Sequence, residues 1–277
     1  MADTPFVIET PTRQRYLKML VYGPYGAGKT YFAGTAADAD GFGDVIVLDA
    51  EAGSLTLADR DNVDVVRIKD FSQFARVYDF LRLHQKYVQE GNDAKLKELQ
   101  KRFAPGIKKL RKYKTVVIDS ITEVQKFCMY KLLGTEIGEV QLDVEPNSPD
   151  WGVWGKATEM MRRLIRTFRD LDMHVIFVAA EQEKEDELKR TRYLPALPGK
   201  LAKEAQGFVD VVGYLRVLQI GADQHRAYLR RLYLLPTEKF DAKDRYHSTG
   251  VAYIDNPTIA RFLVLEDEDT EEDNGNG

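Results

Sequence analysis

Residues 16–30 read YLKMLVYGPYGAGKT, and this stretch indicates the class of fold to expect. Its first part, Tyr16–Tyr22, is a short run rich in apolar and aromatic residues and predicts a buried strand. Its second part, Gly23–Thr30, fits the pattern G-x-x-x-x-G-K-[ST] and opens a helix expected over about residues 29–37. A strand, a glycine-rich turn and a helix in this order predict a loop whose backbone N–H groups wrap a phosphate.

The loop predicts binding of ATP together with Mg²⁺. Lys29 is expected to reach the β- and γ-phosphates, and the Thr30 hydroxyl is expected to ligate the magnesium ion. A glycine-rich turn that binds nothing is the alternative, which the position of the motif between a strand and a helix disfavours. The candidate nucleotide-binding residues are Gly23, Pro24, Tyr25, Gly26, Ala27, Gly28, Lys29 and Thr30.

Further along the chain, short apolar strands alternate with helical stretches, which is typical of a mainly parallel sheet covered on both faces. Strands are expected at residues 44–49, 63–68, 115–119 and 174–180, and helices at residues 71–89, 121–133 and 154–171. Long connections are expected at residues 134–150 and 181–200. Consecutive antiparallel strands are expected at residues 211–219, 226–235 and 251–255. The sequence therefore predicts an α/β fold with a mainly parallel central sheet, flanking helices and antiparallel strands at its C-terminal end.

The composition is that of a globular protein with an acidic end. Among 277 residues, 40 Lys and Arg stand against 44 Asp and Glu, which excludes a histone-like basic protein. Seven of the acids lie in residues 266–273, so we expect a folded core over residues 1–265 and an acidic, disordered tail over residues 266–277. Cys128 is the only cysteine, and no apolar run reaches the roughly 18 residues that span a bilayer. We therefore expect a cytoplasmic protein that does not interact with membranes.

Two carboxylates are candidates for the chemistry of the site. Asp119 ends the apolar strand of residues 115–119, where an acidic residue commonly supports the Mg²⁺ of a phosphate loop, although an Asp there can also cap a helix. The next residue is Ser120, whereas many ATPases place a water-activating Glu there. Glu51, just past the strand of residues 44–49, is therefore the candidate that polarises the attacking water, with an exposed loop Glu as the alternative.

Several of these motifs resemble those of the RecA family of recombination ATPases. Asp49-Ala50-Glu51 is similar to the end of the RecA strand that carries the water-activating Glu, and residues 115–120 resemble the RecA magnesium strand with its following Ser. In size and layout the chain resembles phage-encoded, core-only RecA-like ATPases of the single-strand annealing and recombination type. The resemblance implies a RecA-like P-loop NTPase that hydrolyses ATP and acts on single-stranded DNA in the cytoplasm of a bacterial host. It also implies a single-strand-binding protein as a candidate partner.

Lys243 and Arg245 resemble the paired basic residues that RecA proteins insert into the ATP site of a neighbouring subunit. The resemblance therefore implies head-to-tail self-association, in a ring or a filament, with both residues as catalytic candidates. Ordinary surface charges are the alternative. The chain departs from the RecA pattern at Ala180, where those proteins carry a polar residue that senses the γ-phosphate. Either Glu181 or Gln182 takes this role in a shifted register, or the sensing is weak.

Two segments are candidates for contact with nucleic acid. One, in the connection of residues 181–200, combines basic side chains with an aromatic ring that could stack on a base, with a solvated loop as the alternative. The other, residues 101–114, holds seven basic and no acidic residues. It is either a solvated face or an accessory nucleic-acid patch. The candidate DNA-binding residues are Lys189, Arg190, Arg192 and Tyr193.

The function predicted from these patterns is hydrolysis of ATP coupled to single-stranded DNA. A nucleotide-dependent switch or scaffold that acts through protein partners and hydrolyses ATP slowly is the alternative. A phosphate-loop kinase of small molecules is less favoured, because no Arg-rich lid is evident and the last strands are expected to be antiparallel.

Overall fold

The computed structural model describes residues 16–134, 150–185, 188–221, 227–245 and 249–262, and its centre is one large sheet. Six neighbouring strands run parallel. The apolar runs predicted five of them, whereas the sixth, at residues 211–220, was expected only as the first of the antiparallel strands. In spatial order the six strands are β3 (Val63–Arg67), β2 (Asp44–Asp49), β4 (Tyr113–Asp119), β5 (His174–Glu185), β1 (Lys18–Gly23) and β7 (Val211–Ile220). At the β7 edge the sheet continues antiparallel with β8 (Ala227–Tyr233) and β10 (Tyr253–Asp255). The predicted fold class is confirmed.

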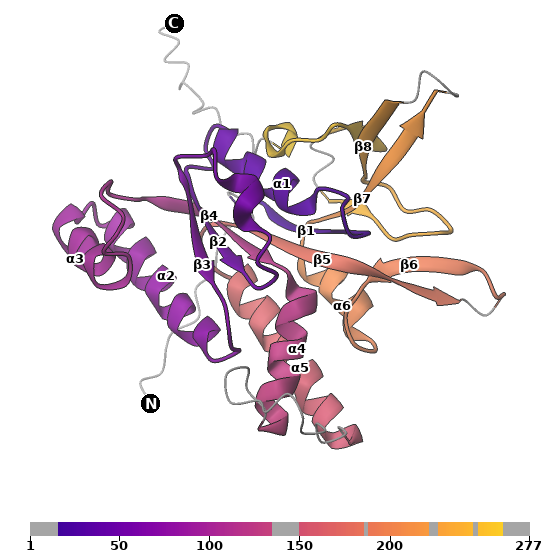
Figure 1. The fold of residues 1–277 in the computed structure, drawn as a ribbon, viewed down its shortest axis with the longest axis horizontal. Helices are drawn as coiled ribbons and strands as arrows, with labels where there is room; N and C mark the ends of the chain where they lie inside the picture. The colour runs from indigo at the N-terminus through magenta and orange to yellow at the C-terminus, as the bar shows by residue number, and fades with distance from the viewer. Residues whose placement is uncertain (1–15, 135–149, 186–187, 222–226, 246–248, 263–277) are drawn as a thin grey trace, which may run out of the picture.

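Helices cover both faces of this sheet (Figure 1). One apolar core, which includes Phe74, Val124 and Ile165, joins the sheet to the helices of the first face. These helices are α2 (Gln73–Gln89), α4 (Ile121–Leu133), α5 (Trp151–Arg169) and α6 (Leu201–Phe208). A second core joins the opposite face to α1 (Lys29–Gly34) and to the 3₁₀ turns Thr35–Asp38 and Ile259–Phe262. Within the described residues, no helix is long and apolar enough to cross a membrane.

The parallel strands end at one edge of the sheet, and their register places the connecting loops together there. Gly23, the last residue of β1, pairs with Ala180 in β5. In β4, Asp119 pairs with Val178 of β5 on one side and with Asp49 of β2 on the other. The segments that follow β2 and β4 therefore start at one level, and the segment that follows β1 starts two residues further along, at the edge where ligands bind in open α/β folds.

Helix α3 (Asp93–Phe103) was not predicted from the sequence. The Asn92 side chain caps it by accepting a hydrogen bond of 3.1 Å from the Lys95 N–H, and Leu96 and Leu99 form its buried stripe. The dense charges around these two leucines conceal the stripe in the sequence. Helix α5 begins three residues earlier than expected, because Asp150 caps it; most of the expected connection over residues 134–150 lies outside the described residues.

The prediction of a long connection over residues 181–200 is wrong, because part of this segment forms a β-hairpin. Strand β5 continues past the end of β1 to Glu185, and β6 (Thr191–Pro195) pairs antiparallel with this extension. The hairpin projects from the sheet in Figure 1. Residues outside the hairpin hold its second strand in place. The Tyr193 N–H donates to the Lys239 carbonyl at 2.7 Å, and the Leu194 side chain is buried. Such tertiary contacts stabilise strand structure in a stretch whose charged sequence is typical of a loop.

His174, the first residue of β5, is buried at the end of the sheet away from the converging loops. Its ring stacks on Phe42 with the centroids 3.9 Å apart, and Nδ1 accepts a hydrogen bond of 3.0 Å from the Leu17 N–H. Burial lowers the pKa of His174 to about 3, and the charge of Lys18 lowers it further. The folded protein therefore contains neutral His174 across most of the pH range.

Burial of neutral His174 is predicted to weaken the folded state at acid pH. The unfolded chain binds the proton below its ordinary pKa of 6.5, whereas the folded chain binds it only near pH 3, so stability falls as the pH drops between these values. Between pH 7 and pH 4.5 this contribution is about 2–3 kcal/mol. We expect His174→Asn, whose amide oxygen can still accept from Leu17, to lose less unfolding free energy over this interval in urea titrations. Equal losses in the two proteins would contradict the prediction.

Candidate nucleotide-binding site

The loop of residues 23–30 leaves the end of β1 and enters α1. Gly23 lies so close to β7 that a Cβ atom there would come within 2.1 Å of the Leu215 carbonyl oxygen. Gly28, just before the first helical residue, has a φ angle of 90°, which residues with side chains rarely adopt. These two glycines allow the tight turn that a phosphate-binding loop requires.

Lys29 is folded back onto the loop that it follows. Its Nζ donates hydrogen bonds to the Gly23 carbonyl at 2.9 Å and to the Pro24 carbonyl at 2.8 Å. Burial lowers the pKa of Lys29, and the carboxylates of Glu51, Asp119 and Glu181 oppose this shift. The ammonium group therefore lies within the electrostatic influence of three carboxylates, at the beginning of the loop.

Thr30 and Asp119 contact each other across the site, as expected for a magnesium centre. The Thr30 hydroxyl donates a hydrogen bond of 2.5 Å to Asp119 Oδ2. Burial is the main cause that raises the pKa of Asp119 to about 6; the hydrogen bond from Thr30 opposes it, and the carboxylates of Glu51 and Asp49 raise the pKa further. A hydroxyl oxygen and a carboxylate side by side, next to a loop that can hold phosphates, fit the oxygen-rich coordination that Mg²⁺ prefers.

Glu51 lies just past the end of β2 and faces the same region. The Ser120 hydroxyl, at the end of β4, donates a hydrogen bond to Glu51 Oε1. The Asp119–Ser120 peptide bond is cis. Ser120 therefore orients the carboxylate that was predicted from the sequence to activate water. The charge of Glu51 acts on both Lys29 and Asp119, so these three groups lie near one another.

Asp49 holds the segment that carries Glu51, a role that the sequence analysis missed. This carboxylate is buried, and Oδ1 accepts hydrogen bonds from the N–H groups of Glu51 at 3.1 Å and Gly53 at 3.2 Å. Oδ2 accepts a further bond of 3.2 Å from the Ser54 N–H. An Asp as the last residue of a buried strand, followed by a glycine-containing turn, was the available signal for such a cap.

The structure distinguishes the two residues proposed in place of the missing sensor at Ala180. The Gln182 amide donates to the Pro195 and Leu197 carbonyls at 2.8 and 3.0 Å, so it stabilises the hairpin. Glu181 is closer to the site, because its carboxylate influences Lys29 and accepts a hydrogen bond of 2.8 Å from the Tyr214 hydroxyl. Of these two side chains, Glu181 is thus the one near the phosphate loop.

Lys243 lies level with the middle of β1, and Arg245 lies toward the end of the sheet opposite the loop. Strand β9 (Lys243–Asp244) pairs with the first residues of β7, which in turn lie beside the beginning of β1. Arg245 forms an ion pair of 2.9 Å with Asp210. Burial lowers the pKa of Lys243, and the charge of Arg245 lowers it further, so the two cations are near each other. They do not belong to the nucleotide site of their own chain, and their role in a neighbour's site stays a prediction.

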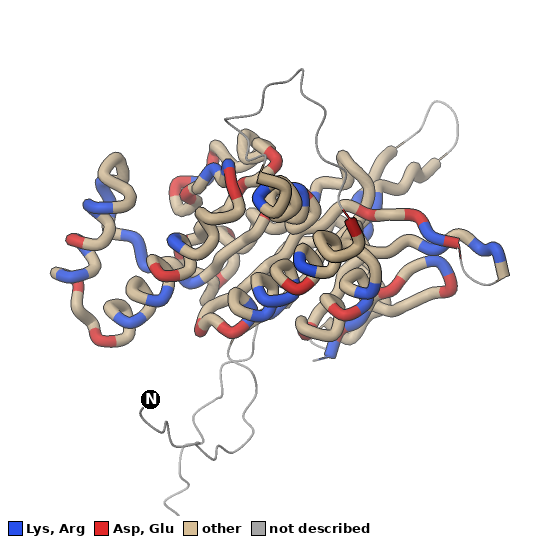
Figure 2. The backbone as a smooth tube through the Cα atoms, turned by 90° about the horizontal axis from the view of Figure 1, so that it is seen from below, with Lys and Arg blue, Asp and Glu red and all other residues tan. Residues whose placement is uncertain are grey.

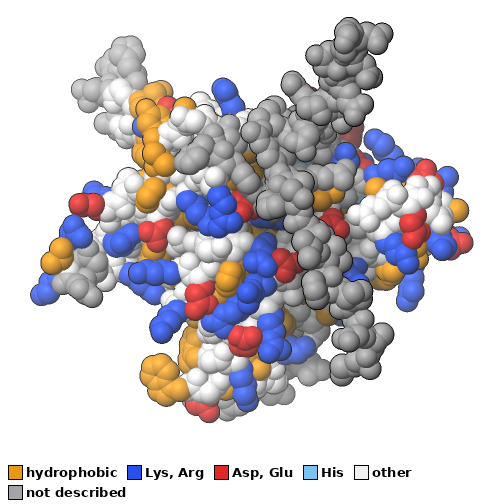
Figure 3. Space-filling view, turned by 180° about the vertical axis from the view of Figure 1, so that it is seen from behind, with side chains coloured by type: hydrophobic (Ala, Val, Ile, Leu, Met, Phe, Trp, Pro, Cys, Tyr) orange, Lys and Arg blue, Asp and Glu red, His pale blue; other side chains and the backbone are white. Residues whose placement is uncertain are grey.

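The basic residues of the β5–β6 hairpin lie among acidic ones. Arg190 forms an ion pair of 3.2 Å with Glu238, and Arg192 forms one of 2.5 Å with Asp241, while Lys189 is exposed. Figure 2 shows both signs of charge along the hairpin, and the face in Figure 3 likewise has Lys and Arg side chains interspersed with Asp and Glu. Any contact of Arg190 or Arg192 with a phosphate therefore competes with a carboxylate.

Tyr193 is less available to a nucleic-acid base than the sequence suggested. Its ring is half-buried and stacks on Tyr214, with centroids 6.0 Å apart and planes inclined by 18°. The guanidinium of Arg216 lies 5.6 Å from the Tyr193 ring centroid. The aromatic ring thus packs at the base of the hairpin, and one of its faces is already occupied.

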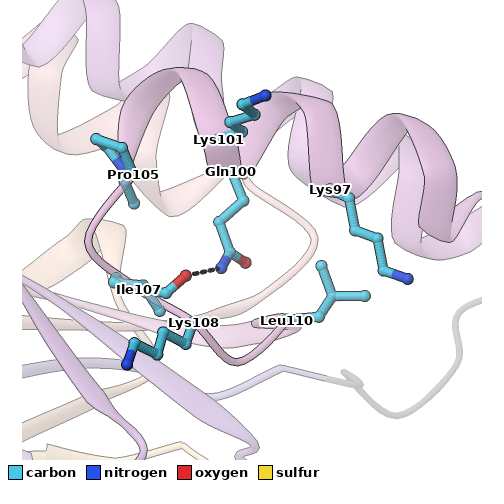
Figure 4. Close-up of a pocket in the computed structure, with 8 residues that line it drawn as sticks. Lys97, Gln100, Lys101, Pro105, Ile107, Lys108 and Leu110 are labelled. Atoms are coloured by element: carbon cyan, nitrogen blue, oxygen red, sulfur yellow. Dashed lines mark hydrogen bonds between the residues drawn. The ribbon is translucent and has the colours of Figure 1, made fainter.

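The basic segment of residues 101–114 lies at the end of β4 far from Asp119. Arg111 is buried and pairs with Asp64 at 2.7 Å, and Lys112 pairs with Asp93 at 3.0 Å. This region contains a hollow of about 240 Å³. Figure 4 shows its lining side chains, among which the Gln100 amide donates to the Ile107 carbonyl. The residues lining it are Lys97, Gln100, Lys101, Ala104, Pro105, Ile107, Lys108 and Leu110. This segment does not belong to the nucleotide site.

A phosphate loop on a parallel strand, with a threonine joined to an acidic residue two strands away, defines a P-loop nucleoside triphosphatase. The chain belongs to the AAA domain family, whose model matches residues 15–246. Membership indicates nucleotide binding and hydrolysis, for which such proteins generally use Mg²⁺. Among curated proteins, none matches this chain.

We predict that Lys29→Ala abolishes tight binding of ATP, because the phosphates lose the ammonium group that lies beside the loop. Calorimetric titration with ATP measures this loss directly. Lys86→Ala, which removes an exposed lysine from α2, should bind ATP like the wild type. An unchanged affinity in Lys29→Ala would show that the nucleotide binds elsewhere.

Proposed function

We propose that the chain is a Mg²⁺-dependent, RecA-like ATPase that acts on single-stranded DNA in recombination, annealing or repair. The observation that carries the proposal is the position of Glu51, which Ser120 orients and Asp49 supports at the strand edge that also presents Lys29. A carboxylate in this position can accept a proton from water beside a bound triphosphate. Family membership supports the ATPase part of the proposal, and the sequence resemblance supports the DNA part.

Each side chain has one task in the proposed reaction. Lys29 binds the phosphates as a buried cation, and Glu51 accepts the proton as the water oxygen attacks the γ-phosphorus. The bond from the γ-phosphorus to its bridging oxygen breaks, which gives ADP and phosphate. Thr30 and Asp119 would hold Mg²⁺, which when bound neutralises charge on the phosphate oxygens.

Head-to-tail assembly is part of the proposal. Because Lys243 pairs with Val212, which pairs with Leu20, Lys243 lies about 10 Å along the strands from Gly23 and two strand spacings to the side of β1. Lys243 and Arg245 can therefore assist hydrolysis only at the site of another subunit, where cations offset charge on the transferred phosphoryl group. A ring or filament of identical interfaces would supply such a neighbour.

Single-stranded DNA is the proposed partner, with a single-strand-binding protein as a second candidate. The β5–β6 hairpin supports this, since it leaves the sheet next to Glu181 and carries Lys189, Arg190 and Arg192. A DNA phosphate in place of Glu238 would exchange one exposed ion pair for another, at little cost in free energy.

A nucleotide-dependent switch or scaffold is the alternative, favoured by the end of β5. Ala180 is buried and has no polar side chain, and Gln182 is engaged within the hairpin. Without a polar sensor, binding of the γ-phosphate would be only weakly coupled to binding of DNA. Such weak coupling is expected of a protein that hydrolyses ATP slowly and acts through protein partners. Turnover that does not respond to single-stranded DNA would favour this alternative.

Glu51→Gln is predicted to leave ATP binding intact and to reduce turnover by about 10²-fold or more, the usual scale for loss of a general base. Steady-state phosphate release and calorimetry measure the two quantities separately. The matched control is Glu98→Gln on the exposed side of α3, which should hydrolyse ATP at the wild-type rate. Wild-type turnover in Glu51→Gln would mean that another carboxylate activates the water.

Single-stranded DNA is predicted to stimulate turnover, and its binding should weaken steeply with salt because phosphate contacts release counterions. Arg190→Ala combined with Arg192→Ala should reduce the slope of log affinity against log salt by about one to two units. The matched double variant, Lys101→Ala with Lys108→Ala, tests the basic segment near α3. A reduced slope in this second variant alone would move the DNA site to that segment.

A further inference from the structure

Arg230, in β8, lies beside the phosphate loop of its own chain. In β8 it pairs with Val217, beyond the level at which β1 ends, and it shares a face with Leu232 of the core under α1. A Cβ atom added to Gly28 would lie 2.5 Å from the Arg230 Nε and 3.0 Å from its Cδ. The side chain therefore occupies the space that the glycine leaves open at the end of the loop.

The guanidinium group of Arg230 is placed near the loop and has no acidic partner among the described residues. Its central carbon is 5.9 Å from the ring centroid of Tyr31, the second residue after Lys29. Arg60 also approaches this ring, at 5.1 Å, but Arg60 pairs with Asp38 at 2.9 Å. Within the described parts of the chain, no carboxylate forms an ion pair with Arg230. Its five N–H donors thus stay available to an anion.

The backbone of Arg230 is fixed relative to α1 by a turn near the end of the described chain. Asn256 donates its N–H to the Arg230 carbonyl at 2.6 Å, and its side-chain oxygen accepts from the Arg230 N–H at 3.2 Å. Three residues later, the Ile259 N–H donates to the Thr35 hydroxyl at 2.8 Å, directly after α1. These bonds tie β8 to the element that carries the loop, so Arg230 starts from a defined position.

We propose that Arg230 is a phosphate-binding residue that acts in cis, with its guanidinium bound to the polyphosphate of a nucleotide held by the same chain. The inference rests on nucleotide binding at residues 23–30, as proposed above. An anion bound by the N–H groups at the end of this loop lies within reach of a side chain that touches Gly28. Lys29 would bind the phosphates from the beginning of the loop, and Arg230 from its end, with the fork geometry that suits phosphate oxygens.

Calorimetric titration of Arg230→Ala with ADP and with inorganic tripolyphosphate tests this assignment. We expect both ligands to bind about tenfold or more weakly, the scale of losing a hydrogen bond to a charged group. Arg230→Lys should recover part of the loss. The matched control is Arg231→Ala, because Arg231 is the next residue of the strand and pairs with Asp255 on the opposite face. It should bind both ligands like the wild type.

Four other outcomes would contradict the proposed role of Arg230, and they differ in what they imply for the proposed function. Wild-type affinity in Arg230→Ala, with binding lost in Lys29→Ala, would overturn the role of Arg230 and leave the proposed function standing. A loss for ADP but not for tripolyphosphate would place Arg230 on the nucleoside and overturn the phosphate assignment. A loss that appears only at protein concentrations at which chains associate would show action in trans and overturn the cis assignment. A wild-type protein that binds neither ligand would refute both the inference and the proposed function.

Discussion

The hydrogen bond from Thr30 to Asp119 joins residues that are 89 positions apart, and the geometry of the nucleotide site depends on it. Strand β5 lies between β1 and β4, so the bond forms only when pairing with β5 fixes the level of β1 relative to β4. The pairing of Gly23 with Ala180, and of Asp119 with Val178, sets that level. A register shift of one residue would turn the Asp119 side chain to the other face of the sheet.

Among the described residues, several carboxylates surround the single ammonium group of Lys29. Lys29 lies near Glu51, Asp119 and Glu181. The negative charge of Asp49 raises the pKa of Asp119. Carboxylates held this close repel one another, and the pKa of about 6 for Asp119 reflects both burial and this repulsion. Binding of a divalent cation offsets the charge of these carboxylates, whereas a triphosphate alone would add to it. The charges of the site therefore favour joint binding of the metal and the nucleotide.

The sequence predicted those parts of the site that lie next to a strong local pattern. The phosphate loop has its own motif, and Asp119 and Glu51 follow apolar strands. Arg230 has no such pattern, because only the register of β8 and the position of α1 distinguish it from Arg231, which points to the opposite face. The β5–β6 hairpin was missed for a similar reason, since contacts with distant residues such as Asp241 stabilise it. Sequence patterns indicate the local conformational preference of a segment. The position of Arg230 and the β5–β6 hairpin depend instead on contacts between segments that are distant in the sequence.

The contact between Gly23 and β7 bears on the choice of inactive variants for work on this protein. Because the Leu215 carbonyl occupies the space in which a side chain would begin, even a methyl group at position 23 must push β1 and β7 apart. Substitution of this glycine would disturb the centre of the sheet as well as the ligand. A binding-deficient variant made there would confuse misfolding with loss of affinity, whereas the side chain of Lys29 can be shortened without moving a strand.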